Sequence, residues 1–260
     1  MRQLSKGRNV KLSGKNIRLN QLFKHRKRIF VLPLDHGVTI GPVQGLRDLP
    51  TLVEKVKDNV DAVVVHKGMV NQIADFIDSG LIVHLSASTA LSPDPNRKEI
   101  VTSVYQSIKL GASAISVHIN LGSSTEAEML KDLGKTAELC EYWGMPLLAM
   151  MYVRDGTKES EYDPVKIKQA ARVAEELGAD IVKVNYTGTI ESFSEVTDSV
   201  KIPVIIAGGP KMSSDEDLLK MISDSVKAGA KGVAIGRNVF QHEKPGLLSS
   251  QIRGILDSVT

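Results

Sequence analysis

The stretch DPVKIKQAARVAEELGADIVKVNYTG, residues 163–188, decides the fold. Its first part spaces apolar residues as an amphipathic helix does, and Gly178 follows as a common helix stop. Its second part, ADIVKVNY, is a short run rich in β-branched residues, which is typical of a strand covered on both faces. A helix followed by a buried strand is the repeating unit of a parallel α/β sheet.

The same unit recurs along the chain after residue 28. Eight segments are expected to be strands, and helical patterns such as residues 214–229 separate most of them. The expected strands are residues 29–36, 62–68, 81–86, 112–120, 146–152, 180–186, 203–209 and 232–237. This pattern predicts an α/β fold, a single (β/α)8 TIM barrel. A doubly wound open sheet is the alternative, but LDHGVTIGP lacks the GxGxxG of its dinucleotide-binding form.

Charge is distributed unevenly along the chain. Residues 1–28 carry ten Lys or Arg and no Asp or Glu, whereas the remainder carries 23 basic and 30 acidic side chains. We therefore expect a basic N-terminal extension over residues 1–28, solvated or in contact with another subunit, and a barrel domain over residues 29–260. Such an arm can bind nucleic acid, and a catalytically idle nucleic-acid-binding barrel is the alternative of another class. No nucleic-acid partner is expected, because the arm has no stacking aromatic residue beyond Phe23.

Cysteine usage and hydropathy exclude other classes of protein. Cys140 is the single cysteine, which rules out an intramolecular disulfide and fits a reducing cytoplasm. No apolar run is long enough to span a membrane, and MRQLSKGRNV lacks the apolar core of a secretory signal. We expect a cytoplasmic protein without a membrane partner.

Polar residues gather where the expected strands end. In a TIM barrel these carboxyl ends form one rim, and function collects there. A structural scaffold does not need such a concentration, so an enzyme is expected. The residues are Asp35, His36, His66, Lys67, His84, Ser86, His118, Asn120, Tyr152, Arg154, Lys183, Asn185, Gly208, Gly209, Gly236 and Arg237.

Lys183 lies between Val182 and Val184, inside an apolar run. An ammonium group there is costly unless its head reaches water, as the heads of lysines often do. The functional alternative is a nucleophile, because desolvation favours the free amine. The barrel and its polar rim favour the nucleophile, with Schiff-base formation as its chemistry. Lys67, beside Gly68 and nearer solvent, is the rival and fits an anion contact better.

Schiff-base chemistry also needs groups that transfer protons during dehydration and during carbon–carbon bond cleavage or formation. Tyr152 and Asp35 end two strands of the same rim and are the candidates. Their structural alternatives are a tyrosine that covers the core and an aspartate that pairs with an arginine.

Glycines end the last two strands, in IAGGPK and AIGRN. TIM barrels often bind phosphate at this place, because glycine lets backbone N–H groups approach the oxygens. Gly208, Gly209 and Gly236 with Arg237 therefore predict a phosphate site. The alternative is a pair of turns beside a surface arginine.

Four strand histidines suggest a metal, because zinc accepts imidazole readily. However, HxH and HExxH spacings are absent, and each histidine stands alone on its strand. We expect no metal, and we expect the imidazoles to bond substrate hydroxyls or each other. They are His36, His66, His84 and His118.

Six contiguous stretches carry a resemblance to a known family. They are LPLDHGVTIGPVQGL, HLSASTALSPDP, CEYWGMPLLAMMY, GADIVKVNYTG, AGGPK and GVAIGRNVFQH. The chain from about residue 17 onward resembles the archaeal-type class I (DhnA-like) aldolase family. The resemblance implies a TIM barrel that works through a lysine imine without metal or cofactor, and a homo-oligomer that is often a decamer. It places the imine on Lys183, the proton donor on Tyr152 and the acid/base carboxylate on Asp35.

The resemblance also implies a set of substrate-binding residues. They are Asp35, His36, Gly37, Val38, Thr39, Tyr152, Val153, Arg154, Lys183, Gly208, Gly209, Gly236 and Arg237. The segment 67–80 looks shorter than in archaeal synthases of the family, which leaves the acceptor aldehyde open.

The implied reaction joins the enamine derived from a phosphorylated keto sugar to L-aspartate semialdehyde. The product is a seven-carbon amino keto acid on an alternative route to 3-dehydroquinate and the aromatic precursors. One alternative is an aldolase that condenses dihydroxyacetone phosphate with the semialdehyde for aminohydroxybenzoate synthesis. The other is a fructose-bisphosphate aldolase.

Overall fold

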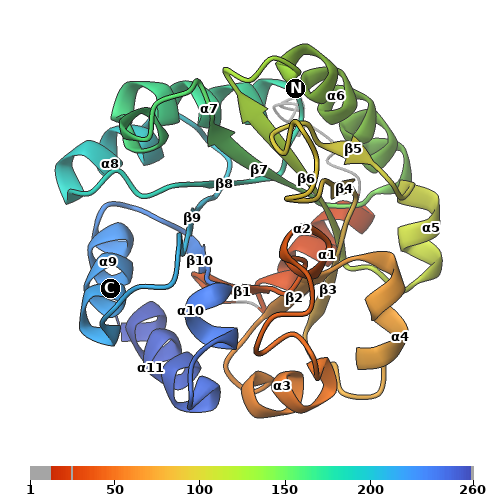
Figure 1. Cartoon of the computed structure of the whole chain (residues 1–260), viewed down its shortest axis with the longest axis vertical. Helices are drawn as coiled ribbons and strands as arrows, with labels where there is room; N and C mark the ends of the chain where they lie inside the picture. The colour runs from red at the N-terminus through yellow and green to blue at the C-terminus, as the bar shows by residue number, and fades with distance from the viewer. Residues whose placement is uncertain (1–12, 25, 259–260) are drawn as a thin grey trace, which may run out of the picture.

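The computed structural model describes residues 13–24 and 26–258, and its centre is a closed barrel of parallel strands (Figure 1). Neighbours around the barrel follow the order β1–β10–β9–β8–β7–β6–β3–β2. The predicted TIM barrel and its eight strands are confirmed, although most strands end a few residues earlier than expected. Their bounds are β1 (Ile29–Pro33), β2 (Ala62–Val65), β3 (Gly80–His84), β6 (Ala114–Leu121), β7 (Leu147–Val153), β8 (Ile181–Val184), β9 (Val204–Ala207) and β10 (Gly232–Ala234).

Helices form an outer ring around the barrel in Figure 1. The side chain of Asp163 accepts two backbone N–H groups at the start of α7 (Pro164–Glu176), and Ser214 caps α9 (Asp215–Lys227) in the same way. None of the described helices is long and apolar enough to cross a membrane. The remaining helices and turns are α2 (Gly37–Ile40), α3 (Leu49–Val56), η1 (Lys67–Met69), α4 (Val70–Ile73), α5 (Val104–Lys109), α6 (Glu126–Trp143), η2 (Glu159–Tyr162), α8 (Ile190–Asp198), α10 (Arg237–Phe240) and α11 (Pro245–Ser258).

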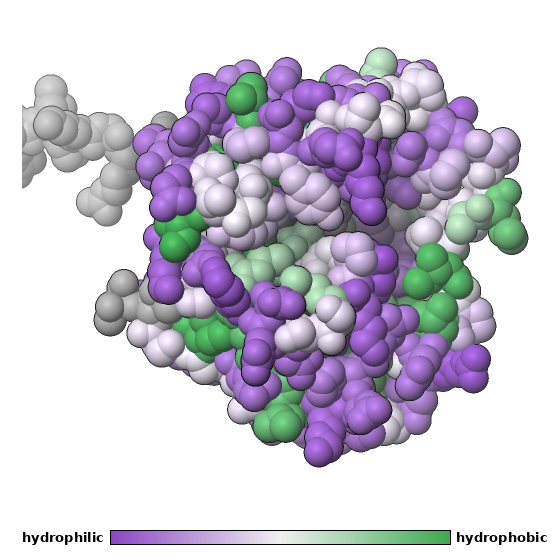
Figure 2. Space-filling model, turned by 60° about the vertical axis from the view of Figure 1, so that its left-hand side comes forward, coloured by the Kyte–Doolittle hydropathy of each residue, from purple (hydrophilic) through white to green (hydrophobic). Residues whose placement is uncertain are grey.

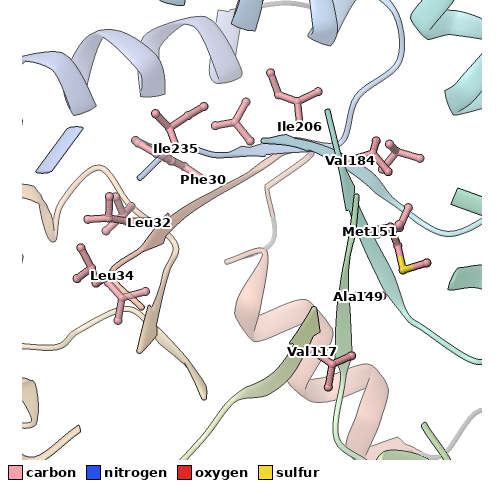
Figure 3. Packing of buried hydrophobic residues seen from close by; sticks show 14 of the residues in the cluster. Phe30, Leu32, Leu34, Val117, Ala149, Met151, Val184, Ile206 and Ile235 are labelled. Carbon is pink, nitrogen blue, oxygen red and sulfur yellow. The ribbon is translucent and has the colours of Figure 1, made fainter. Parts of the chain in front are cut away.

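Two apolar layers result from the alternation of side chains along the strands. The larger layer lies between strands and helices, and Figure 3 shows part of it, including Phe30, Leu32 and Val184. The smaller layer fills the barrel interior and includes Val31, Val64, Ile82, Met150 and Ile205. Val182 and Val184 both belong to the outer layer, so the alternation turns Lys183 between them toward the barrel interior.

Helix α1 (Ser13–Leu22) closes the amino-terminal end of the barrel. Leu22 is fully buried in the interior layer, and Leu19 and Phe23 pack against the same layer. A Cβ at Gly80, the first residue of β3, would lie 2.7 Å from Leu22 Cδ1, so the helix fits tightly against the strand ends. The helix therefore belongs to the folded barrel.

Basic residues of this segment pair with the barrel instead of pointing into solvent. Lys15 Nζ lies 2.6 Å from Glu141 Oε2 and 3.1 Å from Asp180 Oδ2, and Arg18 Nη1 donates to Gly144 O at 2.8 Å. The expectation of a solvated arm is therefore wrong for Lys15 and Arg18 of α1, and contact with another subunit stays a prediction. Residues 1–12 of the predicted extension lie outside the described residues.

The segment between β3 and β6 contains an excursion from the barrel, residues 86–100, that the predicted elements do not include. β4 (Ser86–Ala87) and β5 (Glu99–Ile100) form a small antiparallel sheet beside the barrel. Each strand has two residues, which is too short to leave a periodic pattern in the sequence. The pairing depends on contacts between distant residues, and it holds residues 86–100 next to the rim.

Candidate active site

Two cavities at the carboxyl ends of the strands meet at one group of side chains. The glycine cavity, of 170 Å³, is lined by Gly208, Gly209 and Gly236 among others. The histidine cavity, of 270 Å³, is lined by His66, His84 and His118 among others. In Figure 2 the surface is hollowed and largely hydrophilic residues surround the hollow. The residues common to both cavities are His36, Tyr152, Arg154, Lys183 and Arg237.

Lys183 stands where the two cavities meet. The residue is 6% exposed, and its Nζ lies 3.9 Å from Met150 Sδ and 5.8 Å from the centre of the Tyr152 ring. Among residues 13–24 and 26–258, no carboxylate lies within 4.0 Å of this amine. A buried amine that faces two cavities is placed to attack a carbonyl carbon bound in either of them.

Tyr152 projects from β7 beside this amine. Its ring packs against the His118 ring, with 4.8 Å between the centres, and the Arg154 guanidinium carbon lies 5.2 Å from its centre. The phenol is therefore held between an imidazole and a cation, and its ring lines both cavities. This position suits a group that transfers a proton to a reactant bound at Lys183.

Asp35 follows β1 and lies beside two imidazoles. Its Oδ1 is 3.4 Å from His36 Nδ1, and its Oδ2 is 3.7 Å from His84 Nε2. Burial opposes the charge of Asp35, but the contact with His36 and the nearby Lys183 hold its pKa well below the usual range. His84 does not lower the pKa of Asp35 through a positive charge at pH 7, because burial lowers the pKa of His84 itself to about 4. Asp35 is thus a carboxylate at neutral pH.

Three imidazoles of the histidine cavity, those of His66, His84 and His118, act as neutral groups. Burial lowers the pKa values of His66, His84 and His118. His84 Nδ1 lies 2.8 Å from Ser116 Oγ, and His118 Nε2 lies 2.8 Å from Asn120 Oδ1. Their ring nitrogens therefore serve hydrogen bonding. In the part of the chain that the structure describes, no group of three or more His, Cys, Asp or Glu could hold a metal ion.

The glycine cavity has the features expected of an anion site. A Cβ at Gly236 would lie 2.9 Å from His36 Cε1 and from Pro33 O, so this close approach requires glycine. Gly209 has a φ of +64°, in the left-handed region that favours glycine. Arg237 Nε is buried and has no hydrogen-bond partner among the described residues. An anion bound in the cavity would satisfy this donor.

Some residues of the predicted site lie away from both cavities. Gly37 and Val38 are exposed in α2, and Val153 is buried in β7, whereas Thr39 lines the histidine cavity. Lys67, the rival nucleophile, is exposed, and its Nζ donates to Val101 O at 2.6 Å. The structure thus brings together Asp35, His36, Tyr152, Arg154, Lys183 and Arg237, and it leaves Lys67 outside the cavities.

Other cavity residues were not predicted. Lys98 and Ser88 lie in the excursion of residues 86–100, and Lys158 and Glu161 lie at η2. Glu161 Oε2 pairs with Arg154 Nη1 at 2.6 Å. These residues belong to loops without periodicity. The one signal that could have indicated them was the presence of charged residues in loops that follow barrel strands.

Comparison with known proteins identifies the family of this chain. Residues 29–242 match the model of the DeoC/LacD family aldolases. The chain belongs to this family. It is 46% identical over 249 residues to 2-amino-3,7-dideoxy-D-threo-hept-6-ulosonate synthase 1 of Archaeoglobus fulgidus, which covers 94% of this chain and 91% of the relative. It is 42% identical to 2-amino-4,5-dihydroxy-6-oxo-7-(phosphonooxy)heptanoate synthase of Streptomyces griseus, with 94% and 90% covered.

Solved structures agree with this assignment. An archaeal fructose-1,6-bisphosphate aldolase, with its catalytic lysine covalently bound to the carbinolamine intermediate of the substrate, superposes with a TM-score of 0.85. It is 29% identical, and the match covers 94% of this chain and all of that chain. This DeoC/LacD family aldolase is thus a class I enzyme, of the kind that forms a Schiff base with its substrate.

Proposed function

We propose that this aldolase joins a three-carbon enamine held on Lys183 to L-aspartate semialdehyde and releases a seven-carbon amino keto acid. The observation that carries the proposal is the position of the Lys183 amine at the junction of two cavities. A reaction that joins two substrates gains most of its rate from holding both at the reacting atom. One cavity would hold the donor and the other the acceptor.

The products named for the relatives support the same pair of reactants. Each is a seven-carbon acid with an amino group at C2 and a ketone at C6. An aldol reaction forms the bond between the carbon next to the ketone, C5, and the former aldehyde carbon, C4. The acceptor is therefore the C1–C4 fragment, which is L-aspartate semialdehyde for both products.

The two products differ at C7, and this difference defines the donor. A deoxygenated C7 requires an enamine that ends in a methyl group, which retro-aldol cleavage of a phosphorylated keto sugar would leave on the lysine. A phosphonooxy group at C7 requires dihydroxyacetone phosphate. We propose that the phosphorylated keto sugar is the donor. The first alternative is dihydroxyacetone phosphate as the donor, and the second is cleavage of fructose bisphosphate.

Proton transfers in this reaction fall to Asp35 and Tyr152. Lys183 Nζ adds to the donor ketone, and loss of water gives the imine. Asp35 removes the proton of the donor hydroxyl, the carbon–carbon bond breaks, and a phosphorylated aldehyde leaves the site. The electrons of the broken bond pass to the imine nitrogen as an enamine. The enamine carbon then attacks the aldehyde carbon while Tyr152 protonates the aldehyde oxygen. Water hydrolyses the new imine and frees Lys183.

A donor and acceptor panel tests the proposed function. Purified protein is incubated with aspartate semialdehyde and with a phosphorylated deoxyketose, dihydroxyacetone phosphate or fructose bisphosphate, and products are identified by mass. A seven-carbon amino keto acid without phosphate supports the proposal, and a phosphorylated one supports the first alternative. Cleavage of fructose bisphosphate without any product from the semialdehyde would overturn it.

Arg237 is proposed to bind the donor phosphate. Arg237→Ala should weaken binding of phosphorylated donors by about 1.5–3 kcal/mol, because it removes hydrogen bonds to a charged group. The measurement is donor affinity from the concentration dependence of imine trapping. Unphosphorylated ketones serve as the control, and an equal loss for both would remove Arg237 from the phosphate site.

Metal independence is a further part of the proposal. A lysine imine provides the electron sink that a bound metal supplies in other aldolases, so excess EDTA should leave the rate within error of the untreated enzyme. The rate is measured after extended incubation and dialysis. Inactivation by EDTA that zinc reverses would contradict the lysine mechanism.

We also propose a cytoplasmic location and a homo-oligomer. Cys140 is buried in α6 and is the single cysteine of the chain, which fits a reducing compartment. Tyr105, Tyr142 and Trp143 form an exposed aromatic cluster, with 6.3 Å and 5.2 Å from the Trp143 ring to the other two, which suits a subunit contact. Light scattering measures the assembly.

A further inference from the structure

Lys98 places a positive charge in the histidine cavity without a carboxylate partner. It lies directly before β5, and it lines this cavity but not the glycine cavity. Its Nζ donates to Ser88 Oγ and, at 3.0 Å, to Pro95 O, both of which are uncharged acceptors. Within the described ranges no carboxylate lies within 4.0 Å of this nitrogen. A partly buried ammonium group of this kind is stabilised by an anion.

The excursion that carries Lys98 is anchored to the barrel. Asn120 on β6 donates from Nδ2 to Asn96 O at 2.7 Å, and its Oδ1 lies 2.8 Å from His118 Nε2. Ser124 Oγ adds a bond to Asp94 Oδ2 at 3.2 Å. Lys98 is therefore presented from a loop that is tied to the wall of the cavity, which limits the conformational entropy lost when it binds a ligand.

The other charges of the histidine cavity leave room for one more anion. Asp35 is the only carboxylate among the described residues that line it. Lys183 and Arg237 are shared with the glycine cavity, and Arg154 already pairs with Glu161 at 2.6 Å. His66, His84 and His118 are neutral at pH 7 because burial lowers their pKa values. A reactant that carries its own negative charge would balance Lys98.

We propose that Lys98 binds the carboxylate of the acceptor aldehyde and thereby makes the histidine cavity the acceptor half of the site. This inference rests on the proposed function, which supplies the acceptor. A single ammonium group matches a monoanionic carboxylate. A phosphate that stays on the enamine fragment, as in dihydroxyacetone phosphate, is matched better by the guanidinium of Arg237 and the glycine turns of the other cavity. Lys98 then selects acceptors by charge, next to the carbon that reacts.

The test compares acceptors that differ only in the carboxylate. L-Aspartate semialdehyde and 3-aminopropanal are each condensed with saturating donor by the parent protein and by Lys98→Met. The variant should raise KM for the semialdehyde about 10- to 100-fold and change kcat little, because it removes a charged contact made throughout the reaction. Its kcat/KM for 3-aminopropanal should stay within about threefold of the parent value.

Two further variants separate binding from a structural role. Lys98→Arg keeps the charge and should recover part of the lost affinity for the semialdehyde. Lys55→Met makes the same substitution at an exposed lysine on α3 that lines neither cavity, and this variant should match the parent. Borohydride trapping of the donor is measured in all of them, because a misfolded variant would lose trapping as well.

Several outcomes would overturn the inference. An unchanged KM for the semialdehyde in Lys98→Met excludes a carboxylate contact, and an equal loss for both aldehydes shows that Lys98 only holds the excursion. A parent that traps donors but never uses the semialdehyde contradicts the proposed function instead. In that case glyceraldehyde 3-phosphate and glyceraldehyde replace the two acceptor aldehydes. A loss of kcat/KM in Lys98→Met that is confined to glyceraldehyde 3-phosphate would show that Lys98 binds a phosphate and not a carboxylate.

Discussion

Lys183→Arg should abolish irreversible trapping of a donor ketone by borohydride and lower kcat/KM on the order of 10⁶-fold, the scale for loss of a covalent nucleophile. The guanidinium keeps a positive charge at this place, but it does not deprotonate in the working range and cannot form the imine. Peptide mapping of the parent adduct should place it on VKVNY, residues 182–186. The measurement therefore identifies the nucleophile directly.

Lys67→Arg is the matched control for this result. Lys67 also follows a barrel strand, but it is exposed and its Nζ is bonded to Val101 O, so its substitution should leave trapping intact. Circular dichroism establishes whether Lys183→Arg keeps the fold, and Lys183→Met repeats the test with a smaller apolar side chain. An adduct on Lys67 would mean that the nucleophile has been assigned to the wrong strand.

Tyr152→Phe should lower kcat by roughly 10²- to 10⁴-fold while imine formation persists in part. The phenylalanine ring keeps the packing on His118 and the contact with Arg154, so the loss reports the hydroxyl and not the shape of the site. Turnover and borohydride trapping are measured on the same preparation. A variant within about threefold of the parent would show that Tyr152 only packs.

The barrel could be predicted because each of its strands leaves a recognisable pattern within a few consecutive residues. Most strands are short apolar runs, often rich in β-branched residues such as Val63, Val64 and Val65, and these side chains are buried on both faces of the sheet. The same alternation turned Lys183 inward, since its neighbours Val182 and Val184 pack under the helices. The roles of Lys183, Tyr152 and Asp35 came from the family resemblance, and they await the experiments above.

Features that depend on distant partners were not predicted. Lys15 pairs with Glu141 and Asp180, which lie more than a hundred residues away along the chain, so its charge alone suggested a solvated arm. Lys98 is similar, because its place in a cavity follows from the pairing of two strands of two residues each. Neither kind of contact leaves a period or a spacing in the sequence.

Helix α1 determines which fragments of the protein can be expressed as a folded barrel. The family match spans residues 29–242, yet Leu22 before it and Leu248 and Ile252 after it are fully buried. A cloned fragment with the family's limits would open the floor of the barrel to water and strip part of its outer ring, and exposed apolar surface of that kind drives aggregation. The smallest usable expression fragment therefore starts no later than Ser13 and runs through α11. We expect a fragment that begins at residue 29 to aggregate, because it lacks α1, and such a loss of soluble protein is easily mistaken for an inactive enzyme.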